Sequence, residues 1–85
     1  MTAGKLRVLA GPHRLARRYA ERKGWAEDSY IIVTRSHQLA RLDPALMVSI
    51  VMVKLNALGE RVAAEIREEL SVIRALWTIP MQVEA

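Results

Sequence analysis

The chain begins with a segment in which polar and apolar residues alternate, from Lys5 to Ala10. A period of two is typical of a strand, and the Gly-Pro pair that follows at residues 11 and 12 predicts a turn. From residue 12 the period changes to that of a helix, because four apolar residues share one face and the arginines lie opposite. These apolar residues are Leu15, Ala16, Tyr19 and Ala20. Gly24 predicts the end of this helix in a left-handed cap.

The next segments predict a second and a third strand separated by a short helix. Ser29–Thr34 is a β-branched run between polar residues, which is typical of a strand covered on both faces. Ser36 can cap a short helix through Leu42, which the Asp-Pro pair at residues 43 and 44 interrupts. Leu46–Leu55 is apolar on both alternating sets, and its Val and Ile content favours a buried strand.

A competing interpretation concerns residues 44–77. Asp43 and Pro44 would also suit the N-cap and first position of a helix, so one continuous helix to residue 77 stays open. In the preferred interpretation a helix of about 17 residues begins at Gly59 and Glu60, because apolar residues recur at spacings of three and four. They are Val62, Ala63, Ile66, Leu70, Ile73 and Trp77. Beyond this helix, Ile79–Val83 predicts a short edge strand, where the proline at residue 80 is tolerated.

Alternating strands and helices predict one small α/β domain over residues 1–85. The expected sheet is short and parallel, with strand order 2-1-3, a fourth strand at one edge, and helices packed on it in two or three layers. Such a sheet leaves its edge strands unpaired, and short chains commonly cover these edges by association. We therefore expect a homo-oligomer or a complex with another protein.

The composition favours a folded domain inside the cell. Hydrophobic residues make up 52% of the chain and charged residues 26%, unlike the profile of disordered chains. The absence of Cys excludes disulfides, Cys-rich zinc sites and thiol nucleophiles, and makes the reducing cytoplasm the expected location. The longest stretch without a charge, residues 44–53, is too short to span a membrane, and no signal-peptide pattern follows the N-terminal cations.

The positive charge is concentrated in the N-terminal half of the chain. The net charge is +4, and residues 1–43 hold nine Lys and Arg against four Asp and Glu. Trp and Arg are enriched at the centres of protein interfaces. The candidate partner-binding residues are Arg14, Arg17, Arg18, Arg22, Trp25 and Trp77. The same arginines could neutralise nucleic-acid phosphates, so nucleic-acid binding is the first alternative function.

A second candidate site lies at the carboxyl ends of the predicted strands, where ligands bind in open parallel sheets. Polar and basic residues follow the first two strands, and helix N-termini there present N–H donors to an anion. The candidate anion-binding residues are Gly11, His13, Arg14, Thr34, Arg35, Ser36 and His37. They match neither a dinucleotide fingerprint nor a phosphate loop. A small phosphate or nucleotide binder is therefore the second alternative.

No catalytic set, metal site or cofactor is expected from the sequence. The two histidines, His13 and His37, are separated by a helix and a strand, and no acidic residue stands at ligand spacing from them. Paired carboxylates such as Glu68 and Glu69 are expected on the solvent face of the long helix. The pattern favours a protein that is not an enzyme and has no membrane partner.

Several segments together carry a resemblance to a known group of proteins. They are a strand ending RVLAG, a helix with AxxYA at Ala16–Ala20, and the runs YIIVT and SHQLARLDP. This order, over roughly residues 5–44, resembles small orphan proteins of bacteriophages that infect actinobacteria. The resemblance implies an accessory protein that binds a host protein in the host cytoplasm and perturbs host growth, and it assigns no functional residue. We therefore expect a non-enzymatic protein-interaction module.

Overall fold

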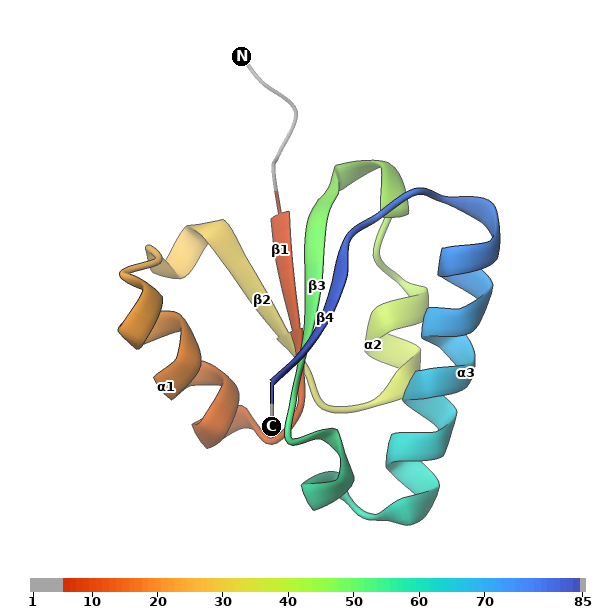
Figure 1. The fold of residues 1–85 in the computed structure, drawn as a ribbon, viewed down its shortest axis with the longest axis horizontal. Helices are drawn as coiled ribbons and strands as arrows, with labels where there is room; N and C mark the ends of the chain where they lie inside the picture. The colour runs from red at the N-terminus through yellow and green to blue at the C-terminus, as the bar shows by residue number, and fades with distance from the viewer. Residues whose placement is uncertain (1–5, 85) are drawn as a thin grey trace.

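The computed structural model describes residues 6–84, which form a four-stranded parallel sheet with helices on both faces (Figure 1). The strands are β1 Leu6–Ala10, β2 Tyr30–Val33, β3 Met47–Val53 and β4 Met81–Glu84. The helices are α1 His13–Lys23, α2 Ser36–Ala40 and α3 Glu60–Leu76. The strand order is β2-β1-β3-β4. The predicted α/β class, the order 2-1-3 and the fourth strand at the edge are confirmed.

Two hydrophobic cores lie on opposite faces of the sheet. α1 covers one face, and α2 and α3 cover the other (Figure 1). Successive residues of β1 alternate between the cores, because Leu9 packs on the α1 side while Val8 and Ala10 pack on the α2/α3 side. The α1-side core also contains Ala16, Tyr19, Ala20, Val51 and Val53. The α2/α3-side core is larger and includes Val33, Leu39, Ile50, Leu55, Ile66 and Leu70. The domain therefore has three layers.

Residues 44–77 contain a strand as well as a helix, so the interpretation as one continuous helix is wrong. β3 lies between β1 and β4 and pairs with both. Its neighbouring residues Ile50 and Val51 enter opposite cores, which explains why both alternating sets of this segment are apolar. A 3₁₀ turn at Leu55–Leu58 follows, and Gly59, with φ of +102°, leads into α3.

α1 begins and ends close to its sequence signals. Pro12 precedes the first turn, where its missing N–H leaves no orphan donor. Gly24 closes the helix in the left-handed conformation at φ of +71°, and the Trp25 N–H donates to the Ala20 carbonyl at 3.1 Å. Ala16 and Ala20 are completely buried, so small side chains bring this helix close to the sheet.

β2 confirms the expectation for Ser29–Thr34 of a strand covered on both faces, because Ile31 and Val33 pack on the α2/α3 side while Tyr30 and Ile32 pack on the α1 side. β2 is an edge strand, and of its four residues only Val33 is fully buried. An edge strand of this three-layer domain therefore contributes side chains to both cores.

The expectation for the short helix is wrong in two respects: Arg35 rather than Ser36 holds the N-cap position, and the helix ends at Ala40 rather than Leu42. Lys5 lies outside the described residues.

The end of β1 lies against the end of β3. A Cβ atom on Gly11 would stand 2.0 Å from the Val53 carbonyl oxygen and 3.0 Å from the Val53 carbonyl carbon. The Gly11 N–H also donates to the Val33 carbonyl at 3.1 Å, which ties this position to β2. Only glycine fits between these backbones.

The described helices are short compared with membrane-spanning segments. α3 is the longest and has 17 residues. Within residues 6–84, no helix combines the length and the apolar character that crossing a membrane requires.

Candidate functional site

The structure divides the predicted partner-binding residues between two layers. Arg14, Arg17, Arg18 and Arg22 are exposed on α1. Trp77 follows α3 in the opposite layer and is 42% exposed. Trp25 is half-buried in the α1-side core, with its ring 5.7 Å from that of Tyr19 and the Arg7 guanidinium 4.9 Å above it. These residues therefore do not form one continuous surface.

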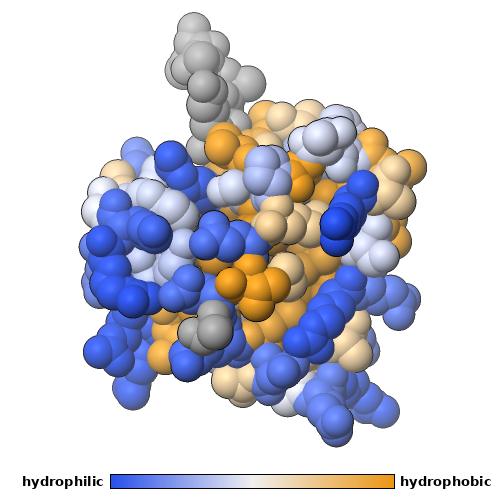
Figure 2. All heavy atoms as spheres, viewed as in Figure 1, coloured by the Kyte–Doolittle hydropathy of each residue, from blue (hydrophilic) through white to orange (hydrophobic). Residues whose placement is uncertain are grey.

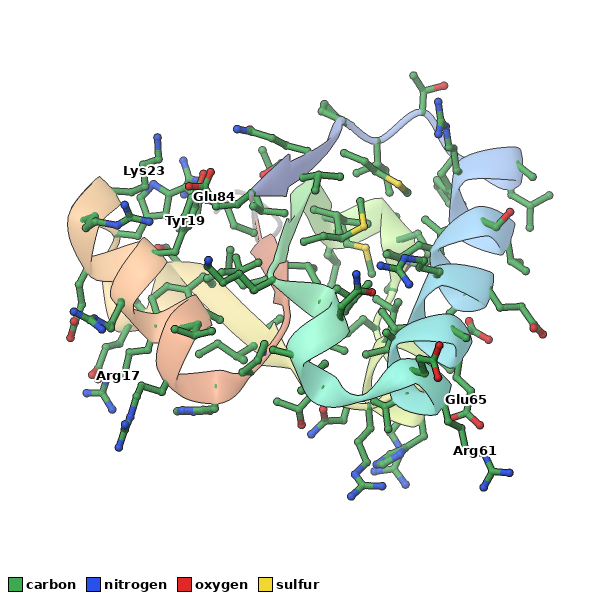
Figure 3. All side chains as sticks on the ribbon, turned by 60° about the horizontal axis from the view of Figure 1, so that its bottom comes forward. Arg17, Tyr19, Lys23, Arg61, Glu65 and Glu84 are labelled. Carbon is green, nitrogen blue, oxygen red and sulfur yellow. The ribbon has the colours of Figure 1, made fainter. Side chains whose placement is uncertain are left out.

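Carboxylates neutralise part of the basic face of α1. Arg17 lies 3.7 Å from Glu21 and 3.3 Å from Glu27, and Arg22 lies 3.7 Å from Glu84. Figure 3 shows Glu84 beside the last turn of α1, near Tyr19 and Lys23, and Arg17 on the other side of the helix. Exposed pairs of this kind contribute little to stability, but they lower the charge that α1 offers to an anionic partner.

Several backbone donors of the candidate anion site already form hydrogen bonds within the protein. The Gly11 N–H is bonded to Val33, and Pro12 has none. The Gln38 side-chain oxygen accepts hydrogen bonds from the N–H groups of Thr34 and Arg35, at 2.7 and 3.1 Å. His13, Arg14, Arg35 and His37 are exposed, and Ser36 is half-buried. The loops do meet at one edge of the sheet, but the N–H groups of Gly11, Thr34 and Arg35 already donate within the protein.

No three His, Asp or Glu side chains of residues 6–84 are grouped so that they could hold a metal ion. The two histidines follow different strands, since His13 begins α1 and His37 lies in α2. The residues described give no geometry from which a catalytic step could be derived.

The outer edge of β4 is a different kind of site, because its backbone groups face away from the sheet. The Pro80 carbonyl accepts a hydrogen bond from Ile50, and the Glu84 carbonyl accepts one from Lys54. Backbone groups of successive strand residues point alternately to the two sides. Met81 and Val83 therefore direct their N–H and C=O groups outward, where no other strand of residues 6–84 pairs with them.

Three hollows flank β4. The largest, about 500 Å³, lies between α1 and the sheet and is called the α1-side groove. It is lined by Leu15, Arg18, Glu21, Arg22, Val53, Lys54 and Glu84. A hollow of about 170 Å³ lies between β4 and α3 and is called the α3-side slot. It is lined by Met52, Arg67, Leu70, Ser71, Arg74 and Met81.

The third hollow, about 220 Å³, adjoins the slot at the carboxyl end of β4, where Lys54, Asn56, Arg67, Val83 and Glu84 line it. Figure 2 shows an apolar band over β4, with hydrophilic side chains on both sides of the band. Val83 in β4 is 71% exposed. The edge thus combines free backbone groups, apolar side chains and flanking cations.

Arg67 and Arg74 were not among the predicted site residues, because in the sequence they look like part of a solvent-exposed helix face. Seven residues separate them, which places them on the same flank of a helix two turns apart. The spacing of seven residues alone therefore indicates that the two arginines share one flank of the helix. What the sequence does not reveal is that β4 returns along this flank.

A second apolar surface lies between α2 and α3. Leu76 is 75% exposed, and with Trp77 and Leu42 it lines a hollow of about 170 Å³. It presents no free strand edge. The β4 edge therefore offers a recognition mode that this surface lacks.

None of the family models, curated proteins or solved structures compared with the chain matches it. The resemblance to phage proteins gains no support from these comparisons.

Proposed function

We propose that this protein is a non-enzymatic interaction module that binds an extended segment of a partner protein as a fifth strand along β4. The observation that carries the proposal is the free outer edge of β4, where Met81 and Val83 direct their backbone groups away from the sheet. In strand addition, main-chain hydrogen bonds supply affinity and pockets for alternate side chains supply specificity. Free backbone groups and hollows that can receive side chains both lie along β4.

Backbone pairing supplies only part of the affinity. Met81 and Val83 offer four outward groups, and a net hydrogen bond contributes about 0.5 to 1.5 kcal/mol. Four bonds give about 2 to 6 kcal/mol, which corresponds to a dissociation constant no tighter than tens of micromolar even before the cost of association. Useful binding therefore requires side chains of the partner in the α1-side groove and the α3-side slot.

A protein segment suits this edge better than single-stranded nucleic acid. Single-strand binders stack bases on exposed aromatic rings. Here the rings of Tyr19 and Trp25 pack against each other in the α1-side core, and Trp77 lines the hollow between α2 and α3. On the face of β4 toward α3, the side chains are the aliphatic Met81 and Val83 instead. An apolar band with free backbone groups favours a polypeptide.

The source of the partner is a separate question from the way it binds. If the resemblance to phage accessory proteins holds, the partner is a host protein and the complex forms in the host cytoplasm. The β4 edge would bind an extended segment of any other protein in the same way, since the proposed binding depends on the backbone of β4 and on the hollows beside it.

Fluorescence anisotropy with labelled, end-blocked seven-residue peptides tests the proposal. The panel alternates Val with Glu, Lys or Thr, and a twelve-nucleotide oligothymidylate is the nucleic-acid probe. We expect peptide binding that Val83→Pro weakens at least tenfold, because proline removes the outward N–H. Val83→Thr keeps that N–H, and we expect it to bind like the unmodified protein.

Two results would contradict strand addition. One is equal binding by folded Val83→Pro and Val83→Thr, and the other is binding of the oligonucleotide without any peptide, which would assign the edge to nucleic acid. Unchanged amide chemical shifts in α1 and α3 would show that both variants keep the fold.

A further inference from the structure

We infer that the partner segment carries Asp or Glu on the side that faces α3, where Arg67 and Arg74 receive these side chains, and apolar residues on the side that faces α1. This inference rests on the proposed strand addition. It names the chemistry of the partner, which the free edge of β4 alone does not specify.

Arg67 and Arg74 lie on the flank of α3 that borders β4. Both are exposed, and both line the α3-side slot, whose apolar lining is Met52, Leu70 and Met81. Seven residues of helix place the two arginines about 10.5 Å apart along the axis. Alternate residues of an added strand are about 6.7 Å apart, so two carboxylates on one face are within reach of the two long side chains.

Neither arginine has a carboxylate partner among the described residues. The three ion pairs found there involve Arg17 and Arg22 only. Arg67 donates to the side-chain oxygen of Asn56, which is neutral. The charge of the α3-side slot is therefore unbalanced.

The acidic residues of α3 are distributed unequally around the helix. At 100° per residue, Glu65 and Glu69 fall on the flank opposite Arg67 and Arg74. Glu69 lines the hollow between α2 and α3, and Figure 3 shows Glu65 beside Arg61 at the outside of the helix. Glu68 lies about 100° from Arg67 around the helix, and Glu60 shares the flank of Arg67 but lies two turns before it. α3 therefore presents a basic flank to β4.

The α1-side groove has a different character. Its lining contains three cations and the two carboxylates of Glu21 and Glu84, and Arg22 lies 3.7 Å from Glu84. Leu15 and Val53 supply apolar lining. A partner side chain on this face therefore meets nearly balanced charge and an apolar surface, which favours an aliphatic residue.

A second copy of this chain does not meet these requirements. The residues of β4 that face α3 are Met81 and Val83, which carry no negative charge. Pairing two copies through β4 would also bring Arg67 and Arg74 of both copies toward the same interface, where their like charges repel. The charge pattern therefore selects a different, acidic polypeptide.

Binding of the Val-Glu, Val-Lys and Val-Thr peptides to charge variants tests this inference. We expect the unmodified protein to bind Val-Glu at least tenfold more tightly than Val-Lys. The double variant Arg67→Glu with Arg74→Glu should reverse that preference. The control Arg41→Glu with Arg61→Glu changes the net charge equally at exposed positions away from β4, and it should keep the preference for Val-Glu.

The outcomes separate this inference from the proposed function. If Val83→Pro abolishes binding of the peptides but the Arg67/Arg74 variant keeps its preference for Val-Glu, strand addition stands and the assigned role of the arginines is wrong. Equal affinity of the unmodified protein for the three peptides would overturn the inference in the same way. If Val83→Pro binds normally, the proposed function fails.

Discussion

Gly11→Ala would disturb the contact between β1 and β3 on which the centre of the sheet depends. The added Cβ would stand 2.0 Å from the Val53 carbonyl oxygen, so the two strands would have to separate by about 1 Å to reach even a tight 3.0 Å contact. Overpacking a core usually costs about 1 to 3 kcal/mol, because side chains move aside. Here the obstructing atoms are backbone, so we expect a loss of about 3 kcal/mol or more.

Such a loss is large for a protein of this size. A chain of 85 residues has a free energy of unfolding of about 4 to 13 kcal/mol, and each 1 kcal/mol shifts the melting temperature by about 4 to 8 °C. Gly11→Ala should therefore lower the melting temperature by at least about 12 °C. Urea unfolding followed by circular dichroism gives the free energy directly.

Gly24→Ala is the matched control. Gly24 has φ of +71°, but no atom lies within 4 Å of the added Cβ, so only the conformational cost of about 1 to 2 kcal/mol applies. If Gly11→Ala costs no more than Gly24→Ala, the close approach of β1 and β3 is refuted.

Three further substitutions test the packing and capping described above, each by urea unfolding. Ile66→Ala should cost about 2 to 5 kcal/mol because Ile66 is completely buried, whereas Leu76→Ala should stay within about 0.5 kcal/mol; equal effects would contradict the assigned core. Gln38→Ala should cost about 0.5 to 2 kcal/mol, because two backbone N–H groups before α2 lose their acceptor, and no loss would show that the cap is not formed. Glu84→Gln should change stability by less than about 1 kcal/mol, because Arg22 in this pair is 69% exposed and the two charged atoms lie 3.7 Å apart, and a larger loss would indicate a stronger pair.

α1 and α3 were predictable because their signals are local. In α1, apolar spacing and Gly24 fix the buried face and the end of the helix within the segment itself. β3 was harder to predict. A strand with a core on each face shows no alternation of polar and apolar residues, and a buried helix gives a similar apolar run. Its place between β1 and β4 depends on contacts between segments far apart in the chain.

The candidate site was only partly predictable, because sequence periodicity shows which residues point away from the core but not what lies beside them. Trp25 and Trp77 are of one residue type, yet the fold places them in different layers. An edge strand near residues 79–83 was anticipated. The cations beside it, Arg67 and Arg74, belong to α3. The sequence shows that they are exposed, but it does not show that β4 lies along their side of the helix.

Amide hydrogen exchange at Val83, measured by NMR with and without the Val-Glu peptide, tests strand addition most directly. In the free protein we expect the Val83 N–H to exchange rapidly because it points away from the sheet, and the Ile50 N–H to exchange slowly because it donates to the Pro80 carbonyl at 2.9 Å. Saturating peptide should slow exchange at Val83. Rapid exchange at Val83 with the peptide fully bound would mean that the segment binds elsewhere, and it would contradict the account.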